Sequence, residues 1–375
     1  MSRPGEASER TAPSVLLISS LYPSGSDPVF GAFVAKQHAS LTRLGVQHRL
    51  VVNSRSRPGA LSGLWKYASL LARTLAAASH RDFDVVLGHF LYPTAWLASL
   101  ASRIAHVPYV VVAHGTDVGS VQRRGPLARA CLSATRRAAC VVTVSRAMET
   151  KVRAELGVPA SVPTQVINMG VDRAVFHPVV DARATLQLPG EARVALFAGN
   201  LIARKAPDVL LEAFARCRAA GACDRLVVVG DGPLRASLER RAAEPDIAGA
   251  VTFTGAIPAD RLAIAMSAAD VFVLPSVAEP LGVVLLEAMA CGTPCVASRV
   301  GGIPEVVAVP ANGRLVESGD PDSLAAAMGE VLAAGRDSFV DACLATAARD
   351  DLDANTARLV EVLARSAGRR REEGS

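Results

Sequence analysis

Two carboxylates flank the start of an apolar helical pattern in the stretch LPSVAEPLGVVLLEAMACGTPCVASRVGGIPE, residues 274–305. Glu279 and Glu287 are eight positions apart, and eight residues of helix rise about 12 Å. That distance is comparable to the reach of a folded nucleotide sugar. Glu279 could therefore accept hydrogen bonds from sugar hydroxyls while Glu287 accepts them from a ribose.

The residues between the two carboxylates are suited to binding a diphosphate. The main-chain N–H groups of Leu281, Gly282 and Val283 would lie at the start of a helix, where they have no partner within the helix. Gly282 has no side chain and would let phosphates approach closely. Alternatively, Glu287 is a buried acid with a local partner and Glu279 a solvated loop residue. A buried glutamate on an apolar helix is costly unless it is paired, so the sequence favours a binding site.

These residues need a parallel sheet to position them, and the chain predicts two such sheets. Short apolar runs recur and each is followed by an amphipathic stretch, which is the pattern of right-handed β-α-β units. The predicted strands are 14–19, 48–52, 84–88, 108–113, 140–144, 193–198, 225–229, 250–254, 271–274 and 294–297. The predicted helices are 31–44, 62–79, 93–105, 125–137, 146–156, 207–219, 233–243, 260–268, 282–290, 303–308, 321–333 and 355–366.

Prolines and glycines crowd the stretch 157–190, where we place the link between two domains. We expect a disordered N-terminus over 1–12, one Rossmann-like domain over 13–185 and a second over 186–345. Residues 346–375 are predicted to form a C-terminal helix and a frayed tail, and the sequence leaves open whether the helix returns to the first domain. Ligands should bind in loops that follow strands, at the carboxyl ends of the sheets.

Composition excludes several classes of protein. The 375 residues are 50% hydrophobic, so the chain can build two cores and is not disordered beyond its ends. The seven cysteines include no C-x-x-C pair, which disfavours a disulfide scaffold or a zinc ribbon and fits a reducing, cytoplasmic compartment. The polar N-terminus, MSRPGEASERTAPS, lacks the apolar stretch of a signal peptide.

The two halves of the chain differ in charge. Residues 1–185 carry 21 Lys and Arg against 10 Asp and Glu, whereas residues 186–375 carry 19 against 25. The basic half could contact the anionic inner face of the cell membrane or gather anionic substrates, and a basic surface without a partner is an equal alternative. Nucleic acid is not expected as a partner, because the basic residues are scattered and no aromatic-rich module accompanies them.

One predicted helix is a candidate for peripheral contact with a membrane. The segment LSGLWKYASLLARTL, residues 61–75, could rest on a membrane surface with Trp65 at the level of the headgroups. An ordinary helix packed on a sheet has the same periodicity and is slightly favoured. The helical stripe consists of Leu64, Tyr67, Leu71 and Leu75.

The E-x₇-E segment, the GTP that follows it and the GG-x-PE from Gly301 to Glu305 resemble the family-4 retaining glycosyltransferases of GT-B fold, also called glycosyl transferases group 1. The resemblance implies an α/β fold of two Rossmann-like parallel-sheet domains that face each other across a cleft, with 13–185 as the acceptor-side domain and 186–345 as the nucleotide-sugar-binding domain. It also implies sugar transfer from a nucleotide-diphosphate donor with retention at the anomeric carbon. Further matches, in order along the chain, are FGAFVAKQHASLTRLG at 30–45, AHGTD at 113–117, NMGVD at 168–172, GDGPLR at 230–235, VTFTGAIPADRL at 251–262 and NGRLVESGD at 312–320.

Carried over position by position, the resemblance implies roles in donor binding. Glu279 holds the donor sugar and Glu287 the ribose. Lys205 neutralises the diphosphate leaving group. Gly31 lets the backbone approach the phosphates, and Ile257 offers backbone contacts to the base. The implied catalysis is electrostatic stabilisation of the leaving group by Lys205 and the helix start, since no two carboxylates obviously flank one bond as a double displacement requires.

Histidines follow two of the predicted strands. The resemblance places His114 near the transferred sugar as a catalytic residue, with Asp117 close behind it. Functional residues of α/β sheets are found at such positions, and a histidine that satisfies local backbone is the alternative. His89 follows strand 84–88 in the same way and could face the acceptor, with function and structure equally favoured.

The sequence departs from the family where the donor phosphates are expected. The family has Gly-Arg before the lysine, whereas this chain has Gly199-Asn200, and the glycine expected after Lys205 is Ala206. Asn is a neutral donor, whereas Arg could make two charge-assisted bonds to phosphate. Arg204, the neighbour of the lysine, could compensate, so Asn200 and Arg204 are both candidates for donor binding.

No metal or other cofactor is expected beyond the nucleotide-sugar substrate. Asp82 and Asp84 resemble a metal-binding pair, but they precede a strand and are interpreted as a capping or surface feature. GDG at 230–232 is interpreted as a tight turn. Cys291 and Cys295 are expected to be small core residues.

The predicted function is sugar transfer to a glycan or lipid-linked acceptor in cell-envelope or exopolysaccharide assembly. A nucleotide-sugar epimerase is disfavoured by the E-x₇-E pattern with its preceding GN-x₄-K. A non-catalytic sugar-nucleotide-binding protein is favoured only by Asn200, and the presence of Glu279, Lys205, Glu287 and His114 argues against it. The function of an NAD-dependent dehydrogenase is disfavoured, because no G-x-G-x-x-G follows the first strand of either predicted domain.

Overall fold

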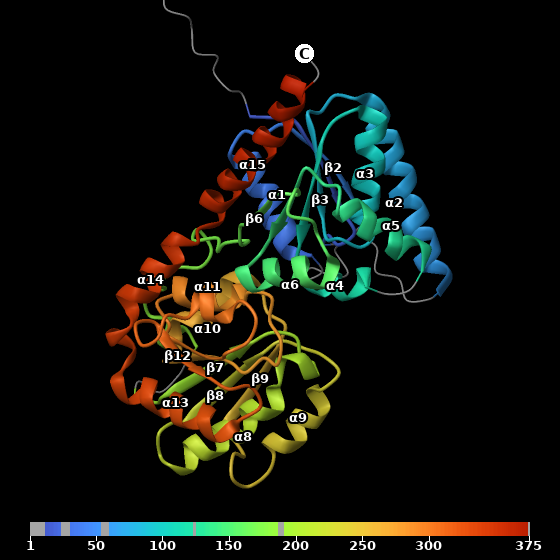
Figure 1. Cartoon of the computed structure of the whole chain (residues 1–375). Helices are drawn as coiled ribbons and strands as arrows, with labels where there is room; N and C mark the ends of the chain where they lie inside the picture. Colours follow the sequence, from blue (N-terminus) through green and yellow to red (C-terminus); the bar gives the residue numbers. More distant parts are fainter. Residues whose placement is uncertain (1–11, 24–30, 54–59, 123–124, 187–190, 374–375) are drawn as a thin grey trace, which may run out of the picture. The chain divides into compact units, whose positions relative to one another are not determined.

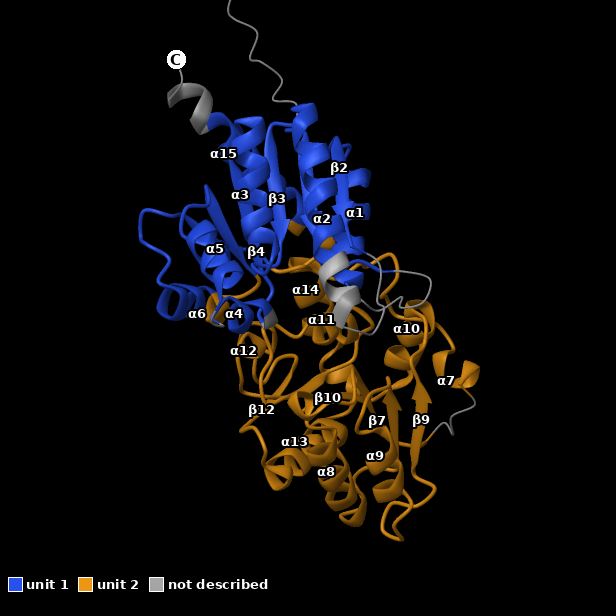
Figure 2. Cartoon of the chain, turned by 90° about the vertical axis from the view of Figure 1, so that its right-hand side faces the viewer, with its two compact units in different colours: residues 1–143, 149–167, 356–375 blue, residues 144–148, 168–355 orange. Residues whose placement is uncertain are grey.

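The chain folds into two compact α/β units, each built on a parallel six-stranded sheet (Figures 1 and 2). The computed structural model describes residues 12–23, 31–53, 60–122, 125–186 and 191–373. Unit 1 consists of residues 1–143, 149–167 and 356–375, and unit 2 of residues 144–148 and 168–355.

The unit 1 sheet has the strand order β2-β1-β3-β4-β5-β6, and each neighbouring pair is parallel. Its strands are β1 (Val15–Ser19), β2 (His48–Val52), β3 (Val85–His89), β4 (Tyr109–Ala113), β5 (Cys140–Thr143) and β6 (Thr164–Val166). The helices wholly or mostly in this unit are α1 (Ala32–Arg43), α2 (Ala60–His80), α3 (Thr94–Ala105), α4 (Thr116–Val121), α5 (Pro126–Thr135), α6 (Arg146–Leu156) and α15 (Leu352–Glu373). The central strands β1, β3 and β4 are buried along their whole length, which explains their continuous apolar sequences.

The first and last helices of the chain complete the core of unit 1. Because α15 supplies three residues of this core, the C-terminal helix does return to the first unit. One buried cluster joins the sheet to α1 and α15 and includes Val15, Leu17, Val34, Leu41, Val85, Leu87, Leu359, Val362 and Leu363.

The unit 2 sheet has the strand order β12-β11-β10-β7-β8-β9 and is also parallel. Its strands are β7 (Val194–Ala198), β8 (Arg225–Val229), β9 (Val251–Gly255), β10 (Val271–Leu274), β11 (Cys295–Ser298) and β12 (Gly313–Val316). Its helices are α7 (Ala182–Thr185), α8 (Pro207–Ala219), α9 (Arg235–Ala242), α10 (Ala259–Ala268), α11 (Val283–Ala290), α12 (Ile303–Val306), α13 (Pro321–Ala334) and α14 (Val340–Arg349), with 3₁₀ turns η1 (Ala203–Lys205) and η2 (Arg336–Ser338).

Each predicted strand is present, and its ends differ from the prediction by a single residue at most. The sequence did not predict the strands β6 and β12 or the helices α4, α7 and α14. β6 and β12 are edge strands of three and four residues, and both are partly exposed. Short edge strands of this kind lack the apolar run that marks a buried strand.

The chain crosses between the units at residues 167/168 and 355/356, whereas the sequence placed the boundaries at 185/186 and 345/346. Residues 168–185 belong with unit 2 because they bond to it. Arg183 Nη2, for example, donates to Asp270 Oδ2 over 2.9 Å.

The residues at the two crossings are bonded to each other. Asn168 Nδ2 donates to Asp350 Oδ1 over 2.7 Å, and Asn168 Oδ1 accepts a hydrogen bond of 2.6 Å from Asn355 Nδ2. An isolated parallel bridge between Val171 and Asp351 runs beside them. The first and last residues of the long unit 2 segment are therefore adjacent.

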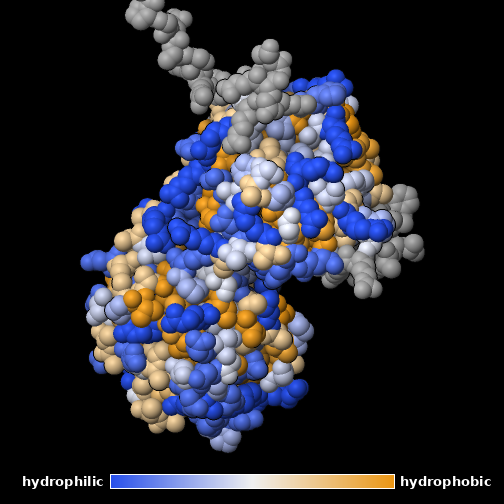
Figure 3. Space-filling model, viewed as in Figure 1, coloured by the Kyte–Doolittle hydropathy of each residue, from blue (hydrophilic) through white to orange (hydrophobic). Residues whose placement is uncertain are grey.

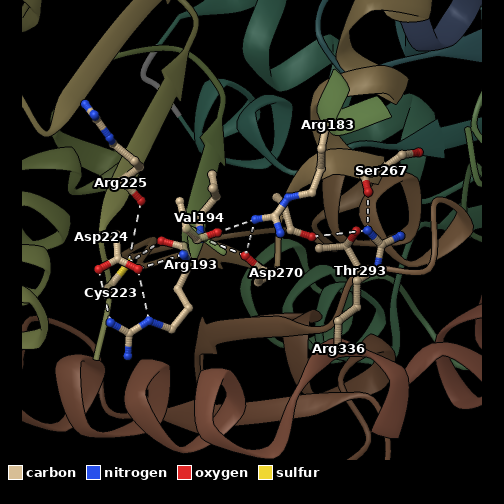
Figure 4. Close-up of polar contacts among 12 residues, drawn as sticks. Arg183, Arg193, Val194, Cys223, Asp224, Arg225, Ser267, Asp270, Thr293 and Arg336 are labelled. Carbon is tan, nitrogen blue, oxygen red and sulfur yellow. Dashed lines mark hydrogen bonds and ion pairs between the residues drawn. The ribbon is translucent and has the colours of Figure 1, made fainter. Parts of the chain in front are cut away.

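Aspartates and arginines fix the amino ends of the unit 2 strands (Figure 4). Asp270 accepts the N–H of Val194 over 2.7 Å. Asp224 accepts both the N–H and the guanidinium of Arg193, over 2.8–3.0 Å. Arg336 donates to main-chain carbonyls at the ends of α10 and α11. Because this charged cluster satisfies strand ends and helix ends, its role is structural, and the opposite ends of the strands are left for ligands.

Within the described ranges, no helix is both long enough and apolar enough to cross a membrane. On the face drawn in Figure 3, hydrophilic residues are interspersed with apolar ones. In α2, Leu70 and Thr74 are buried, whereas Tyr67 and Leu75 are 39% and 37% exposed. The stripe predicted to contact a membrane thus lies partly on the outer side of α2, and the side chains of residues 60–65 lie outside the described part of the chain.

Candidate functional site

The structure brings together two of the predicted donor-binding residues of unit 2. Lys205 ends the turn η1, which follows β7, and Glu279 lies in the loop after β10. Lys205 Nζ forms an ion pair with Glu279 Oε2, and the two side chains are only 13% and 10% exposed. Ser276 Oγ lies 3.4 Å from the same carboxylate oxygen. A cation and a carboxylate thus share one half-enclosed position at the carboxyl ends of adjacent strands.

Two glycines hold the loop that carries Glu279. A Cβ on Gly301 would lie 1.9 Å from the carbonyl oxygen of Glu279, and a Cβ on Gly302 would lie 2.4 Å from that of Pro280. The Gly302 N–H donates to the Glu279 carbonyl over 3.1 Å. Main chain therefore packs directly on main chain, and the GG of the GG-x-PE motif is required by this contact.

The helix α11 begins beside this loop, as predicted. Gly282, its N-cap, has φ 92°, which is accessible to glycine and strained for other residues. In the part of the chain that the structure describes, no acceptor is recorded for the N–H groups of Leu281, Gly282 and Val283. These groups can bind an anion at the positive end of the helix. Glu287 lies further along α11 and is half-buried.

The loop that contains Asn200 is supported by the GDG turn. A Cβ on Gly230 would lie 2.0 Å from the carbonyl oxygen of Gly199, and a Cβ on Gly232 would lie 2.6 Å from that of Leu201. The Leu201 N–H donates to the Asp231 carbonyl over 2.9 Å. The turn itself falls directly after GDG, at residues 233–234, and the close contacts of the two glycines set the position of the loop before Lys205.

Asn200 and Arg204, the two candidates for replacing the family's arginine, differ in exposure. Asn200 is exposed, whereas Arg204 is half-buried. The Arg204 carbonyl accepts the N–H of Val277 over 2.9 Å, which joins the loop after β7 to the loop after β10. No partner is recorded for the Arg204 guanidinium among the described residues, so it remains able to bind an anion.

Ile257 lies in the loop between β9 and α10 and is half-buried. Its main-chain N–H and C=O have no recorded partner within the described ranges, so both can bind a ligand. No recorded contact joins Ile257 to Lys205 or Glu279. Ile257 thus lies at the carboxyl ends of the strands of the same sheet, in the loop after β9, and β8 separates β9 from β7.

Unit 1 contains a second cluster at the carboxyl ends of β3 and β4. His89 Nδ1 and His114 Nε2 are 3.1 Å apart. The rings of Phe33 and Phe90 lie against His114, with centroids 4.8 and 4.6 Å away. His89 is fully buried and His114 is 9% exposed. The prediction that both histidines occupy strand ends is confirmed, and the structure shows that they are bonded to each other.

Asp117 positions the main chain around the two histidines. Its carboxylate accepts the N–H groups of Leu91 (2.7 Å), Gly115 (2.7 Å) and His114 (3.2 Å). Burial raises the pKa of Asp117, and these N–H bonds oppose the increase. The carboxylate therefore ties the end of β4 to the loop after β3.

Both histidines are neutral near pH 7. Burial lowers the pKa of His89 to about 3. Burial also lowers the pKa of His114 well below its ordinary value, and the neighbouring His89 lowers it further. Each ring therefore has one N–H and one acceptor nitrogen.

Gly31 is the N-cap of α1 in unit 1. It has φ 73°, and a Cβ there would lie 2.6 Å from the main-chain carbon of Leu21. The close approach of these two main-chain segments requires a glycine. The residues between them, 24–30, lie outside the described part of the chain.

Other residues considered in the sequence have structural roles. Asp84 accepts the N–H and hydroxyl of Ser14, and Asp82 pairs with Arg49 at the surface. Cys291 and Cys295 are buried, as expected. Among the described residues, no group of three or more His, Cys, Asp or Glu side chains is arranged to hold a metal ion.

The last residue of GG-x-PE makes a contact that the sequence did not predict. The Glu305 carboxylate accepts the N–H groups of Arg146 and Ala147 over 2.9 and 3.0 Å, at the start of α6. Ser145 Oγ donates to the carbonyl of Pro280 over 2.6 Å. These bonds are why residues 144–148 belong to unit 2, and the acidic residue of the motif was the signal available.

Two family models match consecutive parts of the chain. The model "Glycosyl transferase 4-like domain" matches residues 13–169, and "Glycosyl transferases group 1" matches residues 180–341. The chain therefore belongs to the glycosyl transferases group 1 family, and the predicted GT-B fold is confirmed. It is a glycosyltransferase that uses a nucleotide-sugar donor.

Individual relatives agree with this assignment. The chain is 34% identical over 276 residues to a GDP-mannose-dependent alpha-(1-6)-phosphatidylinositol monomannoside mannosyltransferase of Mycolicibacterium smegmatis, with 71% of each chain covered. It is 38% identical over 229 residues to a D-inositol 3-phosphate glycosyltransferase of Mycolicibacterium gilvum, which covers 55% of this chain and about half, 51%, of that relative. Among solved structures, HepE of Anabaena in complex with UDP-glucose superimposes with a TM-score of 0.74 at 22% identity, covering 94% of this chain and 99% of that one. This last likeness concerns the fold alone.

The ion pair between Lys205 and Glu279 leads to a prediction about stability. We expect Lys205→Met to destabilise the unliganded protein by about 2 kcal/mol, because it leaves a largely buried carboxylate without its cation. The double variant Lys205→Met/Glu279→Met should recover most of that loss. The measurement is the urea midpoint of unfolding.

Lys151→Met is the matched control, since Lys151 and Glu155 form an exposed pair at 4.0 Å that should contribute little. A Lys205→Met variant as stable as the unmodified protein would show that the two side chains are not paired in solution.

Proposed function

We propose that the protein transfers a sugar from a nucleotide-diphosphate donor, with retention at the anomeric carbon, to a glycan or lipid-linked acceptor in cell-envelope or exopolysaccharide assembly. The observation that carries the proposal is the set of donor groups in unit 2. Lys205, Glu279 and the unpartnered N–H groups at the start of α11 lie on adjoining loops. This set has a cation and dipoles for a diphosphate and a carboxylate for sugar hydroxyls.

The ion pair of the unliganded protein suggests that Lys205 and Glu279 exchange each other for parts of the donor when it binds. Donor phosphates would take Lys205 as a partner, and sugar hydroxyls would donate to Glu279. The two charges that now satisfy each other would then each bind substrate. Neither group would have to be left buried without a partner at any stage, which keeps the cost of opening the site low.

The proposed catalysis is stabilisation of the departing diphosphate. Negative charge grows on the phosphate oxygens as the bond to the sugar breaks, and Lys205 together with the N–H groups of Gly282 and Val283 would stabilise it. We propose that His114 contacts the transferred sugar. No divalent metal is proposed, because the cation and the helix start would supply the positive charge.

The acceptor proposal draws on the relatives. The names of both relatives contain an inositol phosphate. The first name contains phosphatidylinositol monomannoside, and the second contains D-inositol 3-phosphate. We therefore propose that the acceptor carries an inositol phosphate or a similar polyol phosphate. GDP-mannose, the donor in the name of the first relative, is the first donor to test.

A thermal-shift screen tests donor binding. The protein is heated with UDP-, GDP-, ADP- and dTDP-sugars, with and without magnesium. A ligand that binds only the folded state adds about 2.7 kcal/mol of stability at 100 times its Kd. We expect one nucleotide to raise the midpoint, independently of magnesium, and Glu287→Ala to abolish the increase.

The control for this screen is Glu317→Ala, which removes an exposed carboxylate on the same unit and should keep the full increase. If no nucleotide sugar shifts the midpoint, the donor site is lost and the chain is a non-catalytic member of the family. A shift together with donor hydrolysis that disappears in Lys205→Ala supports transferase chemistry.

The replacement of the family's arginine by Asn200 gives a second test. We propose that the unpaired Arg204 guanidinium supplies the missing charge. Arg204→Gln should weaken donor binding about tenfold, the loss expected for a charge-assisted hydrogen bond. In the background of Asn200→Arg the same substitution should cost much less. Calorimetric titration measures both affinities.

Arg240→Gln, an exposed arginine of α9, is the control and should leave the affinity unchanged. Equal losses from Arg204→Gln in the two backgrounds would mean that Arg204 and residue 200 act independently, contrary to compensation.

We also propose peripheral contact between α2 and an anionic membrane, where a lipid-linked acceptor would be found. Tyr67 and Leu75 are exposed on the outer side of α2, and the N-terminal half of the chain is basic. The protein should sediment with anionic liposomes at low salt, and Leu75→Asp should reduce the bound fraction severalfold.

Leu44→Asp is the matched control, because Leu44 is 40% exposed in the same unit but follows α1. Protein that stays in the supernatant at low salt, or equal effects of the two substitutions, would exclude α2 as the contact.

A further inference from the structure

The histidine pair of unit 1 has a polar atom without a partner. Nε2 of His89 is buried and has no hydrogen-bond partner among the described residues, while its Nδ1 bonds to His114. The His89 side chain is 0% exposed. A ring with one satisfied and one unsatisfied nitrogen has two possible neutral forms, and they differ in cost.

The geometry shows that the contact is a true hydrogen bond between ring nitrogens. The two ring centroids are 5.4 Å apart and the ring planes differ by 22°. With the nitrogens at 3.1 Å, this is the separation of two imidazoles that meet nitrogen to nitrogen close to their planes. N–H bonds and lone pairs of imidazole lie in the plane, so one nitrogen donates and the other accepts.

In the first form, Nδ1–H of His89 donates to Nε2 of His114. His89 is then left with a bare lone pair at Nε2, and the proton of His114 is on its Nδ1. In the second form, Nε2–H of His114 donates to Nδ1 of His89. His89 is then left with an N–H buried without an acceptor, and Nδ1 of His114 is a bare acceptor.

The first form is favoured by the surroundings. A buried N–H without an acceptor is rarer in folded proteins than an acceptor with an unused lone pair. We propose that His89 is a positioning residue, which donates from Nδ1 to Nε2 of His114 and thereby holds His114 as a neutral hydrogen-bond donor at Nδ1.

The main chain of both histidines and the ring of His114 are held in place. Thr94 Oγ1 donates to the carbonyl of His89 over 2.6 Å, at the end of β3. Asp117 binds the main chain of His114, and Phe33 and Phe90 pack on its ring. The orientation of His114 therefore depends on packing, and its tautomer depends on His89.

The consequence concerns the substrate. Since Nε2 of His114 is occupied by His89, Nδ1 is the ring nitrogen left for a ligand, and it would present an N–H. A neutral N–H recognises an oxygen with a free lone pair, such as a sugar hydroxyl. It cannot remove a proton from an acceptor hydroxyl, so His114 would bind and orient and would not act as a general base. This assignment rests on the proposed transferase function.

¹⁵N NMR spectroscopy of the 375-residue protein, labelled with ¹⁵N-histidine, tests directly which ring nitrogen of His114 carries the proton. Signals of His114 and His89 are identified by their loss in His114→Gln and His89→Asn. We expect Nδ1 of His114 to be protonated and Nε2 unprotonated at pH 7. A protonated Nε2, or an imidazolium with both nitrogens protonated, overturns the proposal.

Three variants test the effect on activity. Asn at position 89 can place an amide N–H where Nδ1–H was, so His89→Asn should keep kcat/KM within about threefold. His89→Leu fills the space without a donor and should lower kcat/KM about tenfold, as expected for the loss of one hydrogen bond. His80→Asn changes an exposed histidine of α2 and should have no effect. Equal losses in His89→Asn and His89→Leu, with unchanged thermal midpoints, would show that His89 acts only by filling space.

The two proposals fail in different ways. If donor transfer is absent but the NMR spectrum has the expected protonation, the proposed function is wrong and the tautomer assignment stands. If transfer is present and Nε2 of His114 carries the proton, the function stands and the role of His89 is wrong. In His89→Leu, His114 should exchange between its two tautomers, which loss of packing alone would not cause.

Discussion

The loops at the carboxyl ends of the unit 2 strands pack main chain against main chain, and the functional side chains depend on that packing. Gly301 and Gly302 lie against the carbonyls of Glu279 and Pro280, and Gly230 lies against that of Gly199. Contacts this close leave no room for a Cβ. They fix four loops in two pairs, and the bond from the Val277 N–H to the Arg204 carbonyl joins the pairs, so the side chains that these loops carry need little ordering when a ligand binds.

The two units satisfy their largely buried polar side chains in different ways. Unit 2 places opposite charges together, with Lys205 on Glu279. Unit 1 keeps two histidines neutral and bonds one to the other. An ion pair can be exchanged for ligand contacts, whereas a neutral pair surrounded by Phe33 and Phe90 is more rigid. The first arrangement suits binding of a charged diphosphate, and the second suits recognition of an uncharged sugar.

Much of this organisation was predictable because buried parallel strands leave a strong signal. The apolar runs of β1, β3 and β4 predicted where these strands lie and, with the helical stretches between them, that they are parallel. The start of α11 at Gly282 followed from the place of this glycine after β10. The contact between Lys205 and Glu279 was not predictable from spacing, since 74 residues separate them and only the sheet order brings β7 beside β10. The family resemblance supplied their roles and said nothing of their pairing.

The domain boundary shows where sequence reasoning met its limit. Prolines marked a broad irregular segment, and the exact crossing is decided by side-chain bonds that no local pattern reveals. Asn168 bonds to Asp350 and Asn355, both distant in sequence. The bond between His89 and His114 is of the same kind. Each residue could be placed at a strand end, but their contact depends on the adjacency of β3 and β4.

The bonds at the two crossings give unit 2 the topology of an inserted domain. Its long segment enters after Ile167 and leaves after Asn355, with the two ends held side by side, so the chain returns to unit 1 close to where it left. Unit 1 is consequently assembled from segments that precede and follow the long segment of unit 2. During synthesis the core of unit 1 cannot be completed before α15 is made, so the surface that α15 covers stays exposed while the long segment of unit 2 is synthesised.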